Sequence, residues 1–238
     1  MNAIYDASPV TVFVIATAML VTPFYLLATY VFSRADPRKG IVLGVLWLLF
    51  GASMLLVCLW GVPRQLGPAG GLIVAGAWIT PSLLLIVFRR WALAEPLSQR
   101  WLVGLQLWRA IGAVFLIEMA GGHVPAVFAW PAGLGDVLAA VVALGVLLAY
   151  RPGQPIPAWA VVLVAAVGIA DFLSAFFFGF TSGEGPQNLF PQDTPSRLIE
   201  FPTGMIPLFL VPYAIFFHTL SLLTLARAKN QIRTPGTS

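Results

Sequence analysis

The chain has 238 residues, of which 59% are hydrophobic and only 9% are charged, and its mean hydropathy is +0.91. Soluble proteins carry about 25% charged residues, so this composition excludes an ordinary soluble domain and indicates a membrane protein. The 13 basic residues outnumber the 9 acidic ones, but they fall in short clusters between apolar runs, which is typical of membrane topology signals and argues against a nucleic-acid interface.

Seven apolar runs are long enough to cross a membrane as helices, which takes about 20 residues each. The first run is too long for a cleaved signal and is preceded by no basic segment, so we expect it to be a permanent helix. Segments rich in glycine and proline separate the runs. The sequence therefore predicts an all-α polytopic membrane protein, a single domain of residues 1–238 built as a bundle of seven transmembrane helices. In chain order the runs cover 10–32, 41–62, 70–88, 101–120, 132–150, 157–180 and 202–226.

The distribution of lysine and arginine predicts how the bundle lies in the membrane. One side of the bundle has only Arg64 and Arg197 in its connections. The other side has ten basic residues: Arg34, Arg38, Lys39, Arg89, Arg90, Arg100, Arg151, Arg227, Lys229 and Arg233. Because basic residues concentrate on the cytoplasmic side, the sequence predicts an N-terminus outside and a C-terminus in the cytoplasm.

The connection between the sixth and seventh runs, residues 181–201, is the one long loop. It contains three prolines and is mildly acidic, with Glu184, Asp193 and Glu200 against Arg197. Two interpretations stay open: the loop folds over the outer mouth of the bundle as a lid, or it is an ordinary surface loop.

Four ionisable residues lie inside the runs, where a charge is costly and points to a site or a structural pair. Arg109 is expected near the middle of the fourth run, and Asp171 slightly outward of the middle of the sixth. Asp136 is expected about one turn inside the fifth run, roughly 8 Å outward of its centre. Glu118 is expected near the outer end of the fourth run, where it reaches headgroups or water.

Short connections make the fourth, fifth and sixth helices neighbours, so we expect Arg109 to pair with Asp171 and to have Asp136 as a looser partner. One interpretation is structural: the ion pairs fix the register of the helices, and Asp136 partly caps its own helix N-terminus. The functional interpretation rests on the balance between positive and negative charges. One arginine against two or three carboxylates leaves a deficit that a proton or a cationic or hydrogen-bonding ligand must compensate.

Two further features point to the same region. GLGDVLAA (133–140) resembles GIADFLSA (168–175), and the two segments carry Asp136 and Asp171. His218 is expected in the inner half of the seventh run, as a buried and hydrogen-bonded histidine. His123 is placed at the outer boundary, at a depth too different from that of His218 for a haem held by two histidines.

Several site classes have no counterpart in the sequence. No lysine lies in any run, which excludes a retinal Schiff base, and the phosphate-loop, HExxH, GxSxG and CxxC signatures do not occur. Cys58, as the only cysteine, excludes an intrachain disulfide and a cysteine-based metal site. We therefore predict no catalytic residue, no metal site and no cofactor, and do not favour an enzyme.

Several motifs of the C-terminal half, over residues 105–226, resemble a group of small bacterial multi-pass membrane proteins of uncharacterised activity. They are Arg109 with Gly112 and Phe115, GHVPAVFAWPAGLGD, GIAD, and IPLFLVPYAIFFHTLSL. The resemblance implies a bacterial protein of the inner (cytoplasmic) membrane and implies no activity.

The leading functional hypothesis is a proton-linked permease for a small solute or an ion. Its ligand-binding residues are expected to be Arg109, Asp136 and Asp171, open to the outer side, with Glu118 at the mouth and His218 as a further candidate. The alternative is a non-transporting membrane subunit or sensor whose buried charges are purely structural, and a third option is a haem-binding protein or an intramembrane enzyme. The expected partners are the lipid bilayer and a solute, ion or proton, without nucleic acid; the oligomeric state stays open.

Overall fold

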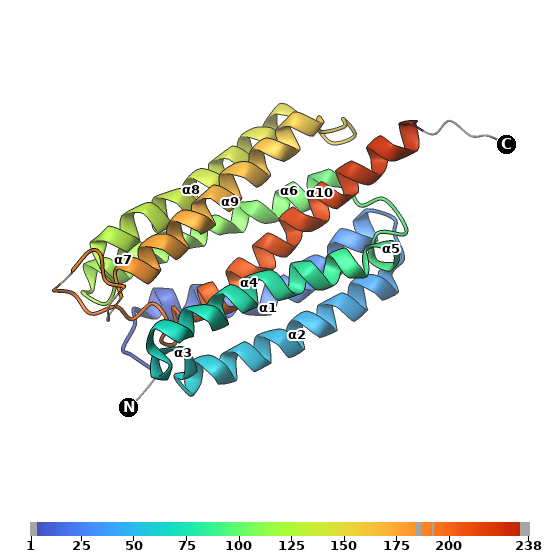
Figure 1. Cartoon of the computed structure of the whole chain (residues 1–238). Helices are drawn as coiled ribbons and strands as arrows, with labels where there is room; N and C mark the ends of the chain where they lie inside the picture. The colour runs from blue at the N-terminus through green and yellow to red at the C-terminus, as the bar shows by residue number, and fades with distance from the viewer. Residues whose placement is uncertain (1–3, 184–186, 192, 234–238) are drawn as a thin grey trace.

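The computed structural model describes residues 4–183, 187–191 and 193–233, the last five of these by their backbone alone, and every regular element in these ranges is a helix (Figure 1). Glu184 and Pro186 of the long loop, and the side chains of Lys229 and Arg233, lie outside the described residues.

Seven helical spans are long and apolar enough to cross a membrane, as the sequence predicts. The chain is therefore a multi-pass integral membrane protein. Four spans are single helices: α1 (Pro9–Phe32), α2 (Pro37–Leu59), α8 (Ala126–Ala149) and α9 (Ala158–Thr181). Three spans are composite: η1 (Gly67–Ala69) with α4 (Gly70–Val87); α6 (Gln99–Gly104), η2 (Leu105–Ala113) and α7 (Val114–Ala120); and η3 (Ile206–Leu210) with α10 (Val211–Arg233). Two short helices, α3 (Val62–Gln65) and α5 (Arg89–Ala92), lie in connections.

The first two helices begin with local signals that satisfy their free backbone N–H groups. The Ser8 hydroxyl accepts from the backbone N–H of Val10 at 3.3 Å, and the Asp36 carboxylate accepts from that of Arg38 at 3.0 Å. A proline follows each of these caps, at the position where a helix needs no N–H donor. These caps fix where α1 and α2 start.

The fifth span starts earlier than expected, and this moves Asp136. Helix α8 begins at Ala126, after Pro125, and includes Pro131, whereas the sequence predicts that the span begins after this proline. Membrane helices tolerate proline because neighbouring groups satisfy the carbonyl that it leaves free. Asp136 is consequently the eleventh of 24 residues in α8. The expectation that it caps its helix N-terminus is wrong, because it lies close to the middle of the span.

The seventh span starts later than expected, and this moves His218. Residues 202–204 form a turn, and the span runs over Ile206–Ala228. The first turn of this span, η3, is a π-helix that contains Pro207 and is closely followed by Pro212, and neither proline can donate a backbone hydrogen bond. His218 is therefore the thirteenth of 23 residues in the span. It lies at mid-depth, whereas we expected it in the inner half.

The seven spans are arranged in two groups with α10 between them (Figure 1). The helices α1, α2 and α4 form one group, and α6–η2–α7, α8 and α9 form the other. The span that contains α10 is the most buried of the seven, and Tyr213, Phe217 and Leu220 are fully covered. Large apolar side chains such as Phe24 and Leu72 point outward, as expected for lipid-facing positions.

The two ends of the bundle differ. We call the end where α1 begins and α9 ends the cavity end, and the opposite end, which carries Arg34, Arg89 and Arg151, the basic end. Side chains close the basic end: the Tyr30 hydroxyl donates to the carbonyl of Ala92 at 2.8 Å.

An ion pair between α2 and a connection adds to this closure of the basic end. The Lys39 ammonium contacts the Glu95 carboxylate at 2.7 Å. The hydrogen bond from Lys39 holds the pKa of Glu95 below its usual range, so this carboxylate is ionised at neutral pH. The closed basic end leaves the cavity end as the side from which the interior is reached.

Candidate functional site

A buried arginine joins two buried aspartates at the centre of the bundle. Arg109 donates from Nε to Asp136 Oδ1 at 2.8 Å, and from Nη2 to Asp171 Oδ2. The side chains are 1%, 11% and 6% exposed, respectively. The expected pair of Arg109 with Asp171 is confirmed, and Asp136 is bound as directly as Asp171. That these residues bind a ligand stays a prediction.

The helix that carries Arg109 is wound more tightly than its neighbours. The segment η2 is a 3₁₀-helix of nine residues, although such runs rarely exceed about four. Side chains three positions apart align in this winding, and it places Gln106, Arg109 and Gly112 on one buried face. The Arg109 side chain therefore points from η2 toward α8 and α9.

Three glycines allow the charged side chains to lie between tightly packed helices. A Cβ built on Gly112 would collide with Asp136, and one on Gly135 would collide with Asp171. A Cβ on Gly168 would collide with His218 Nε2 and Arg109 Nη1. Each polar side chain thus rests on a glycine of the neighbouring helix, and all three positions need the absence of a side chain.

His218 belongs to this cluster, although we expected it at another depth. Its side chain is 3% exposed, and its Nε2 lies beside Arg109 Nη1, against Gly168. Among the described residues its Nε2 has no hydrogen-bond partner. His218 is thus buried as expected, but no described residue supplies the expected hydrogen bond to Nε2.

Glu118 is not at a mouth, and it does not reach headgroups or water. It is 1% exposed and accepts hydrogen bonds from the Thr11 hydroxyl at 2.5 Å and from the backbone N–H of Ser8 at 3.0 Å. Its second oxygen lies 2.8 Å from His123 Nδ1. Glu118 therefore attaches the start of α1 to α7, apart from the Arg109 cluster.

The N-terminal segment continues this network toward the long loop. Tyr5 packs on His123, with ring centroids 5.0 Å apart, and its hydroxyl donates to Thr203 Oγ1 at 3.3 Å. Burial raises the pKa of the Tyr5 hydroxyl above its ordinary value, so it stays protonated and donates. The wrong expectation for Glu118 has a physical reason, since its partners come from a segment about 110 residues away in the sequence.

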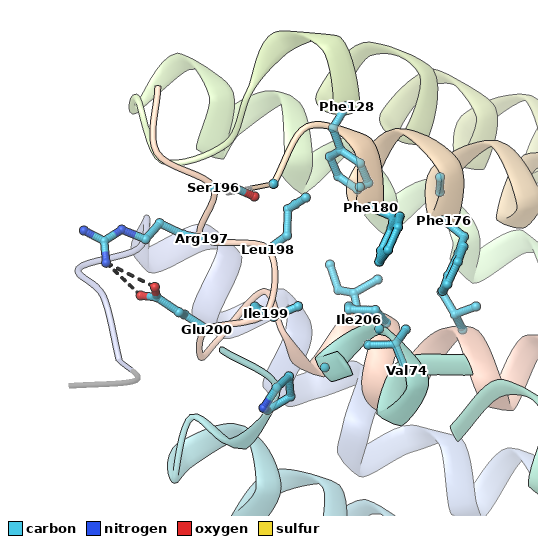
Figure 2. Close-up of a pocket in the computed structure, with 18 of the residues that line it drawn as sticks. Val74, Phe128, Phe176, Phe180, Ser196, Arg197, Leu198, Ile199, Glu200 and Ile206 are labelled. Atoms are coloured by element: carbon cyan, nitrogen blue, oxygen red, sulfur yellow. Dashed lines mark hydrogen bonds and ion pairs between the residues drawn. The ribbon is translucent and has the colours of Figure 1, made fainter. Parts of the chain in front are cut away.

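A cavity of about 430 Å³ leads from the cavity end down to the aspartates. Asp136 and Asp171 lie at its floor, and both are ten residues from the end of their helix, which corresponds to roughly 15 Å of depth. Its walls are mainly apolar and aromatic: Val74, Trp78, Phe115, Phe128, Phe176, Phe180, Leu198 and Ile206. Figure 2 shows Phe128, Phe176 and Phe180 facing Val74 and Ile206 across it.

Phe172 separates the arginine from this cavity. The guanidinium carbon of Arg109 lies 3.9 Å from the centroid of the Phe172 ring, a favourable cation–π contact. Phe172 lines the cavity together with Asp136 and Asp171, whereas Arg109 does not. The floor therefore presents carboxylates, and the positive charge lies behind them.

The rim of the cavity is formed by the long loop and α3. Glu200 is 1% exposed and contacts both Arg64, from α3, and Arg197, whose Nη1 is 2.9 Å from its Oε2 (Figure 2). Residues 195–200 line the cavity, which agrees with the interpretation of the loop as a lid. The sequence alone does not indicate this group, because the pattern of Arg64 and Arg197 is informative only about membrane topology.

We expect Glu200→Gln to loosen the rim. The amide cannot pair with two guanidinium groups, and hydrogen bonds to charged groups contribute about 1.5–3 kcal/mol each when protected from water. Backbone amides of residues 197–204 should then exchange hydrogen roughly tenfold faster by mass spectrometry. Asp193→Asn, an exposed change in the same loop, is the control. Unchanged protection in Glu200→Gln would show that these pairs do not hold the rim.

Two segments near the floor of the cavity, η2 and η3, depart from α-helical winding. The 3₁₀ segment η2 carries Arg109, and the π-helical segment η3 contributes Ile206 to the cavity wall. A second, small void, with room for about one water, lies between them and touches Arg109, Asp136 and Trp108. Such departures from α-helical winding are frequent at hinges and functional sites.

The comparisons with known proteins give a family and no activity. No curated protein and no solved structure matches the chain. Residues 69–226, which include the Arg109 cluster, most of the cavity wall and the long loop, match one family over well over half of the chain. The chain therefore belongs to the family described as a domain of unknown function, DUF8737.

Proposed function

We propose that this integral membrane protein is a permease that binds a small solute in the cavity above Asp136 and Asp171. The observation that carries the proposal is the continuity of the cavity with the buried charges. A volume of about 430 Å³ falls in the usual range of small-molecule sites, roughly 300–1,000 Å³. Ionisable residues at mid-membrane depth that line such a space mark solute and ion pathways.

In this proposal, the described conformation is the state of the permease that is open toward the cavity end. The cavity reaches the floor from the cavity end, while Tyr30 and the Lys39–Glu95 pair close the basic end. Release on the other side requires the floor to open, and η2 and η3, which both touch the floor, are suited to bend. The proposed orientation, in an inner membrane, places the cavity end outside, because basic residues favour the cytoplasmic side.

A non-transporting subunit or sensor is the second candidate, and one observation favours it. Arg109 contacts both aspartates directly, as a purely structural ion-pair network would require. Such a network fixes helix register without any ligand. The two candidates differ in one measurable respect, because only a permease exposes the same cavity residue alternately to the two sides of the membrane.

Ala175→Cys tests this difference without knowledge of the solute. Ala175 lines the cavity one helical turn from Asp171, on the side of the cavity end. In a Cys58→Ser background, we expect a membrane-impermeant thiol reagent to label this cysteine from outside in intact cells. We also expect labelling from the cytoplasmic side in inverted vesicles, since a permease must open there in another state.

Two exposed positions supply matched controls for the direction of labelling. Asp193→Cys, in the long loop, should react only from outside, and Gln154→Cys, at the basic end, only from the cytoplasmic side. Labelling of Ala175→Cys from outside alone would contradict a permease and favour a sensor. A reversed pattern at both control positions would overturn the proposed orientation.

A further inference from the structure

We infer that the cavity binds an organic monocation with an apolar or aromatic body, and that this cation displaces one proton from the Asp136–Asp171 floor. The inference names the substrate class of the proposed permease and rests on that function. It follows from the charge of the floor and the chemistry of the walls.

The floor has an excess of one negative charge. Arg109 supplies one positive charge to Asp136 and Asp171, which carry two negative charges when both are ionised. His218 is the other titratable group near them; its Nε2 lies beside Arg109 Nη1, against Gly168, and it does not line the cavity. Among the described residues that line the cavity, α4 and α10 contribute no ionisable side chain. Nothing described at the floor balances the second carboxylate.

A single charge in an apolar bundle is costly, so the empty site is expected to hold a proton. The proton and a bound monocation compensate the same missing charge, and binding of one therefore expels the other. The exchange leaves the site neutral before and after: one cation enters the floor and one proton leaves for water. The geometry offers a place for the cation, because Phe172 covers Arg109 and the carboxylates face the cavity.

The side chains that line the cavity walls favour a ligand with an apolar or aromatic body. Trp78, Phe176 and Phe180 form an aromatic surface, with the rings of Phe176 and Phe180 parallel within 4°. Aromatic faces attract cations and bury apolar groups. These three aromatic side chains offer no oxygen ligand to a bare metal ion, whereas they can contact both the charge and the apolar body of an organic ammonium.

Benzyltrimethylammonium is a suitable probe, because its charge does not depend on pH and its ring fits an aromatic wall. We expect the purified full-length protein to bind it. Its affinity should increase by up to about tenfold for each unit by which the pH is raised, over the pH range in which the unliganded site is protonated. Calorimetry in two buffers of different ionisation enthalpy should then give one proton released per bound cation. An excess of neopentylbenzene, which has the same shape without the charge, should not displace it.

Asp171→Asn removes the excess charge, and Asp193→Asn removes an exposed acid as the matched control. The floor variant should lose at least about tenfold in affinity and release no proton, while the control keeps both. Binding that is independent of pH without proton release, or displacement by the neutral probe, would overturn the inference. These measurements on the unmodified protein decide the question even if Asp171→Asn fails to fold.

The outcomes for the permease and for its substrate class can be told apart. A cavity cysteine labelled from both sides without binding of the cation would keep the permease and reject the monocation. Binding with proton release, but labelling from one side only, would keep the cation site in a sensor.

Discussion

Arg109→Met is expected to remove most of the folded protein from the membrane. The variant leaves Asp136 and Asp171 buried next to each other without the cation that both contact. Loss of one partner from a buried ion pair costs about 3–5 kcal/mol, which is a large part of the total stability of a typical protein. The amount of monodisperse protein in detergent extracts, together with its melting temperature, measures the effect.

A rescue variant separates unpaired charge from lost packing. Combining Arg109→Met with Asp136→Asn and Asp171→Asn keeps the shapes of the two acids and removes both orphaned charges. Because apolar or neutral replacements of a whole buried network are often tolerated, we expect the triple variant to recover most of the folded protein. If Arg109→Met alone were as stable as the original protein, the ion pairs would not stabilise the centre of the bundle.

The second large effect is expected from one added methyl group. Gly135→Ala places a Cβ on Asp171 Oδ1, so either α8 and α9 must separate or the aspartate must move away from Arg109. Inserting a carbon into a packed interface costs about 1–3 kcal/mol, and here it also disturbs a buried charge. We expect a lower melting temperature, and a loss of cation binding under conditions in which the protein remains folded.

Gly145→Ala is the matched control, since it makes the same change in the same helix. No atom lies within 4 Å of the Cβ that it would add, so only the helix preference of alanine matters. That preference should stabilise the protein by about 0.5–1 kcal/mol. If both variants melted at the same temperature, close contact at Gly135 would not be part of the site.

The parts of the site that could be predicted follow from the free-energy cost of a charge in the membrane, and not from how the side chains pack. A charge in hydrocarbon is so unfavourable that Arg109 had to find its carboxylates, and neighbouring helices limit the choice to Asp136 and Asp171. The seven spans follow in the same way from the length of apolar runs. Both results need only the order of residues along the chain.

What could not be predicted comes from packing between distant segments. Glu118 is satisfied by Ser8 and Thr11, and Glu200 by Arg64, contacts that no local pattern indicates. The depth of Asp136 was missed because Pro131 lies inside a helix. The cavity itself depends on where aromatic rings from α4 and α9 leave space, which composition does not reveal.

The order of the charged helices has a consequence for how the protein is made. Arg109, Asp136 and Asp171 lie on three consecutive spans, so each charge meets its partner soon after it leaves the insertion machinery. The span that contains α10 comes last and lies between the two helix groups. This span packs against helices of both groups, so its insertion adds the last contacts between them and is the step that commits the chain to its assembled form.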